Sequence, residues 1–449
     1  MNRAPKVLVI NPPIYDVAAY SFWSAPLGLL QVGAVLRESG MDVELLDCLA
    51  EKEEKRKDDG RAPFISRRAA TPDALKETGK KFRRYGMAAD EVERRLGSLG
   101  PPDLVLVTCV MTYWYPGAAE VAEVCRERFP GAKIVVGGIY PSLCYDHARK
   151  QMRGADLVVT NGMLDAFYAF VEESLSWKLA LKPQQAEPGA FPFPAFDLYR
   201  VRYFVPLLTS FGCVYRCAYC ATPRLYPRMA RRRPEDVLAE IGHWHSRGVS
   251  RFVLYDDNFL FEAEAFARPI LSAIGRLPYE ISVYNPNGLN ASLLDGETAS
   301  LLAAAGFREV RLGLETADPV LLKRMGGKVT REGFARGVEL LGRAGFSAGS
   351  IRAYVMAGLP MQRHEEARAT IAFASALGVM VDLATYTPIP GTELFGRYAH
   401  LARYPIASEP LFQNNALFPF AWEGFTEADM DELKAYARAQ RGNDVGGCV

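Results

Sequence analysis

The chain has 449 residues, of which 49% are apolar and 23% charged, so it can bury a large core in two or three domains. Its 53 Lys and Arg balance 52 Asp and Glu, which argues against binding dominated by nucleic-acid phosphates. The first apolar run is too short for a secretory signal, and the uncharged residues 17–36 contain one proline and two glycines. The sequence therefore predicts a cytoplasmic protein with no nucleic-acid partner and no membrane span.

The first 176 residues alternate short apolar runs with helical stretches. This alternation predicts a doubly wound, Rossmann-like parallel sheet that binds ligands at the carboxyl ends of its strands. Residues 51–100 interrupt the rhythm with a charge run and predict an insertion with helices at 71–85 and 88–96. One further helix is expected at Leu27–Ser39. The expected strands are Lys6–Asn11, Asp42–Asp47, Leu104–Cys109, Lys133–Gly138 and Asp156–Asn161.

A second α/β series follows residues 177–200, a proline-rich stretch that is expected to be a linker. Six strand–helix units predict a partial (β/α)6 barrel over residues 201–397, with active residues at the carboxyl ends of the strands. A C-terminal segment, 398–449, either covers the barrel mouth or mediates contacts. The expected strands are Val205–Ser210, Arg251–Tyr255, Glu280–Tyr284, Glu309–Glu315, Ser350–Ala357 and Asp382–Thr387.

Three of the eight cysteines lie together in FGCVYRCAYC, where Cys213, Cys217 and Cys220 follow the first strand of the second series. In a chain without a secretory signal, clustered cysteines indicate metal binding or catalysis before disulfides. Three thiolates on one loop suit three corners of an iron–sulfur cluster and leave the fourth iron open. A structural zinc site, which needs a fourth ligand not found near this loop, and unrelated reduced thiols are the alternatives.

With this spacing and position, the segment from Phe204 to about Leu394 resembles the radical S-adenosylmethionine superfamily. The resemblance implies a [4Fe–4S] cluster on Cys213, Cys217 and Cys220, with S-adenosylmethionine on the open iron. It also implies an electron donor, a reductase or a protein of the flavodoxin or ferredoxin type. Reductive cleavage would then yield a 5′-deoxyadenosyl radical, chemistry that no side chain supplies. Tyr219 occupies the aromatic position that the family uses.

Further motifs at the strand ends resemble the same family. Asp256 and Asp257 in YDDNF are suited to hold a polar ligand or an ammonium group, or to cap a helix. Glu315 in RLGLET matches the family position that contacts the ribose or amino group of S-adenosylmethionine; a structural salt bridge is the alternative. Gly358 in AGLP resembles the family's turn near adenine, and Pro388 in TPIPGTEL its sixth-strand turn.

Two other polar residues are candidates within this second series. Asn285 ends the third strand and is placed to orient S-adenosylmethionine or substrate, although Asn-Pro also favours an ordinary turn. Arg352 lies among apolar strand residues, either in a buried ion pair or as a hook for a carboxylate.

The N-terminal domain resembles the cobalamin-binding domain of the cobalamin-dependent branch of this superfamily. The resemblance rests on NPPIYD, PLGLLQVGAVLRESGMDVELLD, TCVMTYWYPG and GGIYPSLC, most of them after predicted strands. Core packing for the aromatic residues and a tight turn for the glycines are the alternatives. The cobalamin-binding residues that it implies are Asn11, Pro12, Thr112, Tyr113, Trp114, Gly137, Gly138, Tyr140 and Pro141.

The branch's D-x-H-x-x-G signature, which supplies a histidine to cobalt, is absent from this domain. Its single histidine, His147, lies in CYDHARK and is expected on a helix surface. The resemblance then implies no histidine below the cobalt. TNGM, at residues 160–163, also departs from the Gly-Glu that the branch often shows at this place.

The sequence therefore predicts an enzyme that transfers a methyl group from methylcobalamin to an unactivated carbon of a small molecule or biosynthetic intermediate. A cobalamin-dependent enzyme that rearranges, dehydrates or cyclises its substrate is the first alternative. A sensor or carrier without catalysis is the second. A tRNA methylthiotransferase is disfavoured because the scattered Cys48, Cys109, Cys125 and Cys144 do not supply a second cluster and the tail is neither basic nor long.

Overall fold

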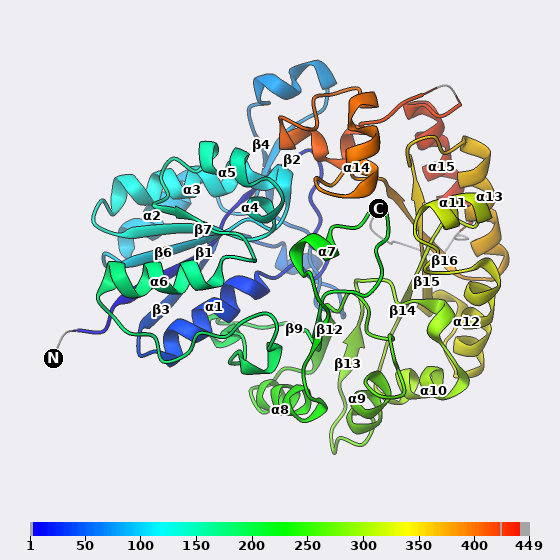
Figure 1. Ribbon diagram of the computed structural model, residues 1–449, viewed down its shortest axis with the longest axis horizontal. Helices are drawn as coiled ribbons and strands as arrows, with labels where there is room; N and C mark the ends of the chain where they lie inside the picture. Colours follow the sequence, from blue (N-terminus) through cyan, green and yellow to red (C-terminus); the bar gives the residue numbers. More distant parts are fainter. Residues whose placement is uncertain (1–2, 423, 441–449) are drawn as a thin grey trace. The chain divides into compact units, whose positions relative to one another are not determined.

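The computed structural model describes residues 3–422 and 424–440, which form two compact units (Figure 1). Unit 1 contains residues 3–204 together with 224–230 and 405–417. Unit 2 contains residues 205–223, 231–404, 418–422 and 424–440. Cys448 lies outside the described residues.

Unit 1 is built on five parallel strands in the order β3-β1-β6-β7-β8, which confirms the predicted doubly wound sheet. The order is that of flavodoxin-like sheets, which bind ligands where the chain changes direction, here between β1 and β6. The first two strands have the predicted bounds, whereas the last contains two residues because a turn from Thr160 to Met163 follows it. The strands are β1 (Lys6–Asn11), β3 (Asp42–Asp47), β6 (Leu104–Thr108), β7 (Lys133–Gly137) and β8 (Leu157–Val158).

Helices cover both faces of this sheet, with α1 and α6 on one side and α2 and α3 on the other (Figure 1). Val7 and Val9 of β1 face α1 and α6 in one core cluster, and Leu8 and Ile10 alternate to the opposite face, also buried. A strand buried on both faces needs a continuous apolar run, which is what KVLVIN supplies. The helices are α1 (Leu27–Glu38), α2 (Ala89–Ser98), α3 (Tyr115–Arg128), α4 (Ile139–Leu143), α5 (Tyr145–Gln151) and α6 (Leu164–Leu175).

The insertion contributes a small antiparallel sheet, β2-β5-β4, to unit 1. Its strands are β2 (Ile14–Asp16), β4 (Ser66–Arg68) and β5 (Arg83–Tyr85). The helix predicted over 71–85 was wrong: a short 3-10 turn ends at Gly79, whose φ of +66° breaks a helix, and the next residues pair with β2. The second helix predicted in the insertion is present as α2.

Unit 2 contains two three-stranded parallel sheets, β9-β12-β13 and β14-β15-β16, with helices on the outer side of the strands (Figure 1). Leu289 connects the two sheets, because its N–H donates to the carbonyl of Arg311 and its carbonyl accepts from Gly313. Six strands in chain order agree with the predicted (β/α)6 arrangement. The strands are β9 (Val205–Leu207), β12 (Arg251–Leu254), β13 (Ser282–Tyr284), β14 (Val310–Glu315), β15 (Ile351–Ala357) and β16 (Met380–Thr385).

Most helices of the second series connect the carboxyl end of one strand to the amino end of the next, and the last two follow the final strand. None of the helices in the described residues is both long and apolar enough to cross a membrane. The helices that follow the start of the second series are α7 (Thr222–Leu225), α8 (Pro234–His245), α9 (Ala267–Ile274), α10 (Gly296–Ala304), α11 (Pro319–Arg324), α12 (Arg331–Arg343), α13 (His364–Ala376), α14 (Glu393–Tyr398) and α15 (Glu427–Gln440).

Candidate functional site

The three clustered cysteines lie on a loop that leaves the short strand β10 (Ser210–Phe211). Cys213, Cys217 and Cys220 are half-buried free thiols. In the described residues, no three His, Cys, Asp or Glu side chains gather around the position of a single metal ion. A cuboidal cluster does not require this, because each thiolate ligates a different iron. Three thiols on one loop therefore fit such a cluster.

A glycine-rich loop after α11 holds the cysteine loop in place. Ala218 donates its N–H to the carbonyl of Met325 at 3.2 Å. Gly326, with φ of +107°, approaches so closely that a Cβ there would lie 3.1 Å from the Cα of Cys217. Only glycine combines this backbone conformation with such an approach. The other side of the cysteine loop is fixed by Leu394, whose N–H donates to the carbonyl of Ala218 at 2.9 Å.

Glu315, Lys328 and Tyr219 surround the thiols with charge and an aromatic ring. Glu315 ends β14 in a left-handed conformation, φ of +64°, which is strained for a residue other than glycine. Burial raises the pKa of its carboxyl, and the Lys328 ammonium opposes that shift. Burial lowers the pKa of Lys328, but Glu315 and the three thiols outweigh it, so that this pKa is raised. Burial and the Glu315 charge raise the pKa of the Tyr219 hydroxyl.

The two adjacent acids after β12 have different surroundings. Asp256 is buried and accepts hydrogen bonds from the Thr209 N–H at 2.9 Å, the Thr209 hydroxyl at 2.6 Å and the Ser210 hydroxyl at 2.5 Å. It ties β9 and β10 to β12 and has a structural role. Asp257 is half-buried beside it, and burial together with the Asp256 charge raises the pKa of its carboxyl to about 6. Asp257 is therefore the member of the pair that is available to a ligand.

Two residues predicted near S-adenosylmethionine have other partners. Asn285 donates to the carbonyls of Asn287 and Arg311, both at 2.9 Å, and accepts from the Arg311 N–H, so it joins β13 to β14. Arg352 forms a two-point ion pair with Asp382, with distances of 2.7 and 2.5 Å. It lies near the amino end of β15, whereas Glu315 and the cysteine loop lie at carboxyl ends. The ion pair, and not the carboxylate hook, is what the structure shows.

The two turn residues of the predicted site lie at carboxyl ends. Gly358 follows β15 with φ of +80°, and its N–H donates to the Gln362 side chain at 2.9 Å. Pro388 is buried in the loop after β16. Gly358 remains a prediction for the adenine side of the site, and Pro388 one for the sixth-strand turn.

In unit 1, the first candidate residues lie at the switch point of the sheet. Asn11 and Pro12, at the end of β1, are buried. The Asn11 amide donates to Asp47 at 2.9 Å, and the Tyr199 hydroxyl donates to the same carboxyl at 2.5 Å. Burial raises the pKa of Asp47 to about 6. This end of the edge therefore holds a carboxyl whose hydrogen-bond donors among the described residues are all neutral.

The loop after β6 supplies the aromatic part of this edge. Thr112 and Tyr113 are buried, and the half-buried Trp114 donates from Nε1 to the buried Asp16 at 2.7 Å. The Asn414 amide donates to the same carboxyl at 2.6 Å. Residues 405–417 therefore close part of the carboxyl edge of unit 1.

Other atoms of the protein pack closely against Gly137, Gly138 and Tyr140 of the predicted cobalamin site. A Cβ on Gly137 would lie 3.0 Å from Val159, and one on Gly138, φ of +109°, would lie 2.6 Å from the carbonyl oxygen of Cys109. Tyr140 is fully buried, and its hydroxyl lies 2.7 Å from Nδ1 of His147. The glycines thus permit a close approach of β7 to its neighbours. Pro141 is buried in α4.

What remains open at this edge fits a flat, largely apolar ligand. Met111 is 37% exposed, and the half-buried ring of Trp114 follows it in the loop after β6. His147 is half-buried against Tyr115, not on the helix surface as predicted, and burial lowers its pKa. These contacts fit cobalamin held by apolar surface at the switch point.

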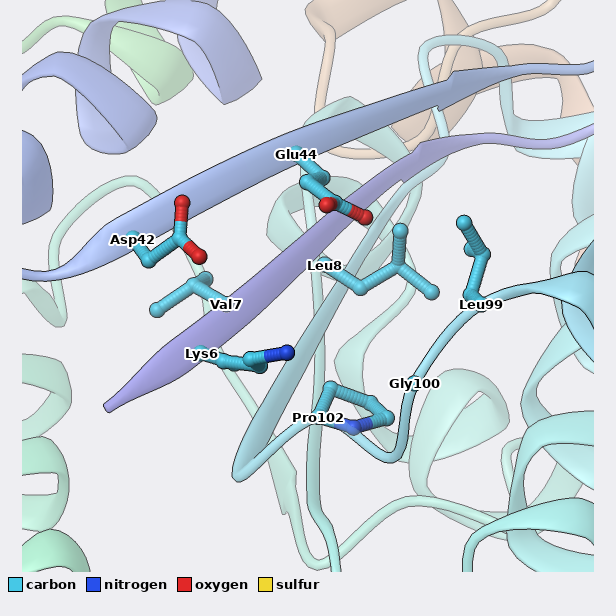
Figure 2. Close-up of a pocket in the computed structure, with 8 residues that line it drawn as sticks. All are labelled: Lys6, Val7, Leu8, Asp42, Glu44, Leu99, Gly100 and Pro102. Carbon is cyan, nitrogen blue, oxygen red and sulfur yellow. The ribbon is translucent and has the colours of Figure 1, made fainter. Parts of the chain in front are cut away.

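A small hollow in unit 1 lies away from this edge (Figure 2). Lys6 and Asp42, the first residues of β1 and β3, place it at the amino ends of the strands. In a parallel sheet that end does not carry the ligand. The lining residues are Lys6, Val7, Leu8, Asp42, Glu44, Leu99, Gly100 and Pro102.

Sequence reasoning missed several residues of these edges. Lys328 had a signal, because it follows two glycines in KRMGGK, both with positive φ. The contact between Asp16 and Asn414 had none, since the two residues lie 398 residues apart and only the fold brings them together.

Two family models match the chain: the radical SAM superfamily over residues 207–374 and the B12 binding domain over residues 72–170. Cytidylyl-2-hydroxyethylphosphonate methyltransferase of Streptomyces wedmorensis is 22% identical, over 72% of this chain and 67% of that protein. Bacteriochlorophyllide d C-12(1)-methyltransferase of Chlorobaculum tepidum is 24% identical, over 60% of each chain. The chain thus spans about 60–67% of the length of these relatives.

A solved structure shares the fold. The radical S-adenosylmethionine methyltransferase TsrM from Kitasatospora setae, with cobalamin and a [4Fe–4S] cluster bound, is 20% identical with a TM-score of 0.64. The similarity covers 89% of this chain and 75% of that chain.

The chain belongs to the radical S-adenosylmethionine superfamily, within the class that also carries a B12-binding domain. Its cofactors are those of that class: a [4Fe–4S] cluster, S-adenosylmethionine and cobalamin. The predicted fold class and cofactors are confirmed.

Proposed function

We propose that this protein is a cobalamin-dependent radical S-adenosylmethionine methyltransferase that acts on an unactivated carbon of a small molecule or biosynthetic intermediate. The observation that carries the proposal is the combination of a three-thiol loop beside Glu315 and Lys328 with a B12-binding domain in one chain. Two relatives named as methyltransferases support methylation over rearrangement, dehydration or cyclisation.

In unit 2, each side chain of the site has a distinct task. Cys213, Cys217 and Cys220 hold the cluster. Glu315 accepts hydrogen bonds from the ammonium or ribose of S-adenosylmethionine, and its buried surroundings strengthen such contacts. Asp257 adds a second carboxylate for the cationic part of the ligand. The half-buried ring of Tyr219 shields part of the thiol loop from water.

In unit 1, the switch-point edge holds cobalamin. Asn11, Pro12, Thr112 and Tyr113 shape the floor of this edge, and Trp114 presents a ring that Asp16 keeps in one orientation. Together, the bound cluster and cobalamin supply the electron and the methyl group that side chains cannot carry.

We infer a functional division into a cobalamin-binding domain, residues 1–176 with the insertion 51–100, a linker, 177–200, a radical domain, 201–397, and a C-terminal segment, 398–449. A flavodoxin-type or ferredoxin-type protein serves as electron donor. Reduced clustered thiols favour a cytoplasmic location.

The products of S-adenosylmethionine test this function. Protein reconstituted without oxygen is incubated with hydroxocobalamin, a chemical reductant, methyl-deuterated S-adenosylmethionine and a panel of phosphonate, tetrapyrrole and peptide substrates. Methyl transfer predicts S-adenosylhomocysteine together with 5′-deoxyadenosine and a deuterated product. The Cys213→Ala/Cys217→Ala/Cys220→Ala variant is the control.

Formation of 5′-deoxyadenosine without S-adenosylhomocysteine would replace methyl transfer by a non-methylating reaction. Absence of both nucleosides from the reconstituted wild type, with the cluster spectrum intact, would contradict an enzymatic role.

A further inference from the structure

Three exposed cations lie on the segments that form and support the cysteine loop of unit 2. Arg216 lies between Cys213 and Cys217, and Lys323 and Arg324 end α11. In the described residues, none of these three cations has an ion-pair partner. We call Arg216, Lys323 and Arg324 the cationic rim.

The rim is attached directly to the cluster ligands. Met325, next to Arg324, accepts the hydrogen bond from Ala218, and Gly326 packs on the Cα of Cys217. Val214, next to Cys213, is 45% exposed. Val214 and Arg216, the sequence neighbours of the half-buried Cys213 and Cys217, are thus both exposed.

The two segments that carry the rim have charge of one sign. Residues 211–220 and 321–331 contain five Lys and Arg and no Asp or Glu, in a chain whose total charges balance. Lys328 is the half-buried member of this set and faces the thiols. Arg331 lies over the ring of Phe373 at 4.4 Å. The remaining three form the rim.

We propose that the cationic rim, together with the exposed Val214, is the docking surface for a small acidic one-electron carrier protein that reduces the cluster. The inference rests on the proposed function and names the partner of that same site. One electron passes from the reduced carrier to the cluster; no bond is made or broken and no proton moves. The short path from Val214 and Arg216 to the ligand cysteines suits such a transfer.

The carrier fits this surface better than an anionic substrate does. The groups that face a bound ligand at the strand ends include the carboxyls of Asp257 and Glu315, which disfavour an anion there. The rim cations instead point to solvent, where opposite charges speed association and make it dependent on salt.

The holoenzyme tests the proposal. Reduced flavodoxin, an acidic one-electron carrier, is mixed with cluster-loaded protein, and bleaching of the cluster is followed by stopped flow at low and high salt. The Lys323→Glu/Arg324→Glu variant is expected to lose at least about tenfold in the rate constant at low salt, and less at high salt. Binding of oxidised flavodoxin, measured by calorimetry, should weaken in parallel.

The matched control is Arg276→Glu/Arg343→Glu, which makes the same charge change at two exposed arginines, one just after α9 and one at the end of α12. Photoreduction by neutral 5-deazariboflavin should bleach the cluster equally in all variants and drive S-adenosylmethionine cleavage. Equal loss in both double variants, or none in the rim variant, would overturn the docking surface while leaving the function intact. Failure of S-adenosylmethionine cleavage with deazariboflavin would instead count against the proposed function.

Discussion

The carboxyl ends of the strands carry different chemistry in the two units. In unit 2 this end carries three thiols, Glu315 and Lys328. Among the described residues, neither Glu315 nor Lys328 forms a salt bridge. In unit 1 the carboxyls of Asp16 and Asp47 are covered by neutral donors such as Trp114 and Asn11. The first edge is charged and suited to a reactive group, whereas the second is neutral and suited to hold a large ligand.

The amino ends of the unit 2 strands sharpen this contrast. There Arg311 and Arg352 share Asp382, and Arg311 also pairs with Glu309 at 2.6 Å. Charges at this end satisfy one another and stabilise the fold. Charges at the carboxyl end are left for ligands, as expected of α/β proteins with ligand sites at that end.

The largest effect is expected from the thiols. Cys217→Ala removes one ligand of the cluster, so iron content and the formation of 5′-deoxyadenosine should both fall to background. Cys125→Ala, a change at a buried cysteine of unit 1, should leave both unchanged. Full iron content in Cys217→Ala would contradict the assignment of that thiol.

Substitution of Glu315 is expected to have a smaller effect than loss of a thiol. Two variants of this residue should weaken binding alike but differ in stability. Glu315→Ala and Glu315→Gly both remove the carboxylate and should weaken S-adenosylmethionine binding by at least about tenfold. Glycine relieves the strain at φ of +64°, so Glu315→Gly should be about 1 kcal/mol more stable than Glu315→Ala. Calorimetric titration and thermal melting measure the two effects; unchanged binding in both variants would remove Glu315 from the site.

Asp382 tests the other end of unit 2. Asp382→Ala leaves Arg352 without its partner, and breaking such a pair costs about 3 kcal/mol, which lowers the melting temperature by several degrees. Arg352→Met/Asp382→Leu, which removes both charges, should recover part of this loss. S-adenosylmethionine binding should stay unchanged in folded protein, and a selective loss of binding in Arg352→Met would restore the carboxylate hook.

Asp47 is expected to show the smallest effect, a pH dependence. Its pKa is raised to about 6 by burial, above the ordinary 3.8, so the folded state holds a proton that the unfolded state releases between pH 4 and 6. Stability from this group is present below about pH 4 and is lost as pH rises through about 6. Asp47→Asn should therefore gain about 3 kcal/mol relative to wild type as pH rises across this range.

The exposed Asp42 lies on the same strand, and Asp42→Asn serves as the control for this pH series. The melting temperatures of Asp47→Asn and wild type are compared from pH 4 to 7. A difference that stays constant over this range would show that the Asp47 carboxyl has an ordinary pKa and would contradict the prediction.

The sequence allowed the fold to be predicted well where patterns are local. β1 and β3 have the predicted bounds because buried apolar runs are unambiguous. The helix over 71–85 was wrong because pairing with β2, far along the chain, overrode local propensity. The partners of polar side chains were the hardest feature to predict. The sequence does not show that Arg352 pairs with Asp382, or that Asn285 donates to the backbone of β14.

The cysteine loop was predictable because its ligands lie within eight residues, whereas the unit 1 edge depends on a segment from the other end of the chain. Asn414 reaches Asp16 only in the folded protein. The contact between Asp16 and Asn414 arises from tertiary packing, and no sequence pattern indicated it.

The central claim is that two cofactors occupy two separate units. Anaerobic protein is reconstituted with iron and sulfide, mixed with hydroxocobalamin and desalted, and the optical spectrum is recorded for wild type and Cys213→Ala/Cys217→Ala/Cys220→Ala. The broad cluster band should vanish in the triple variant while the corrin bands stay in both proteins. A wild type that retains the cluster band but no corrin would contradict the claim.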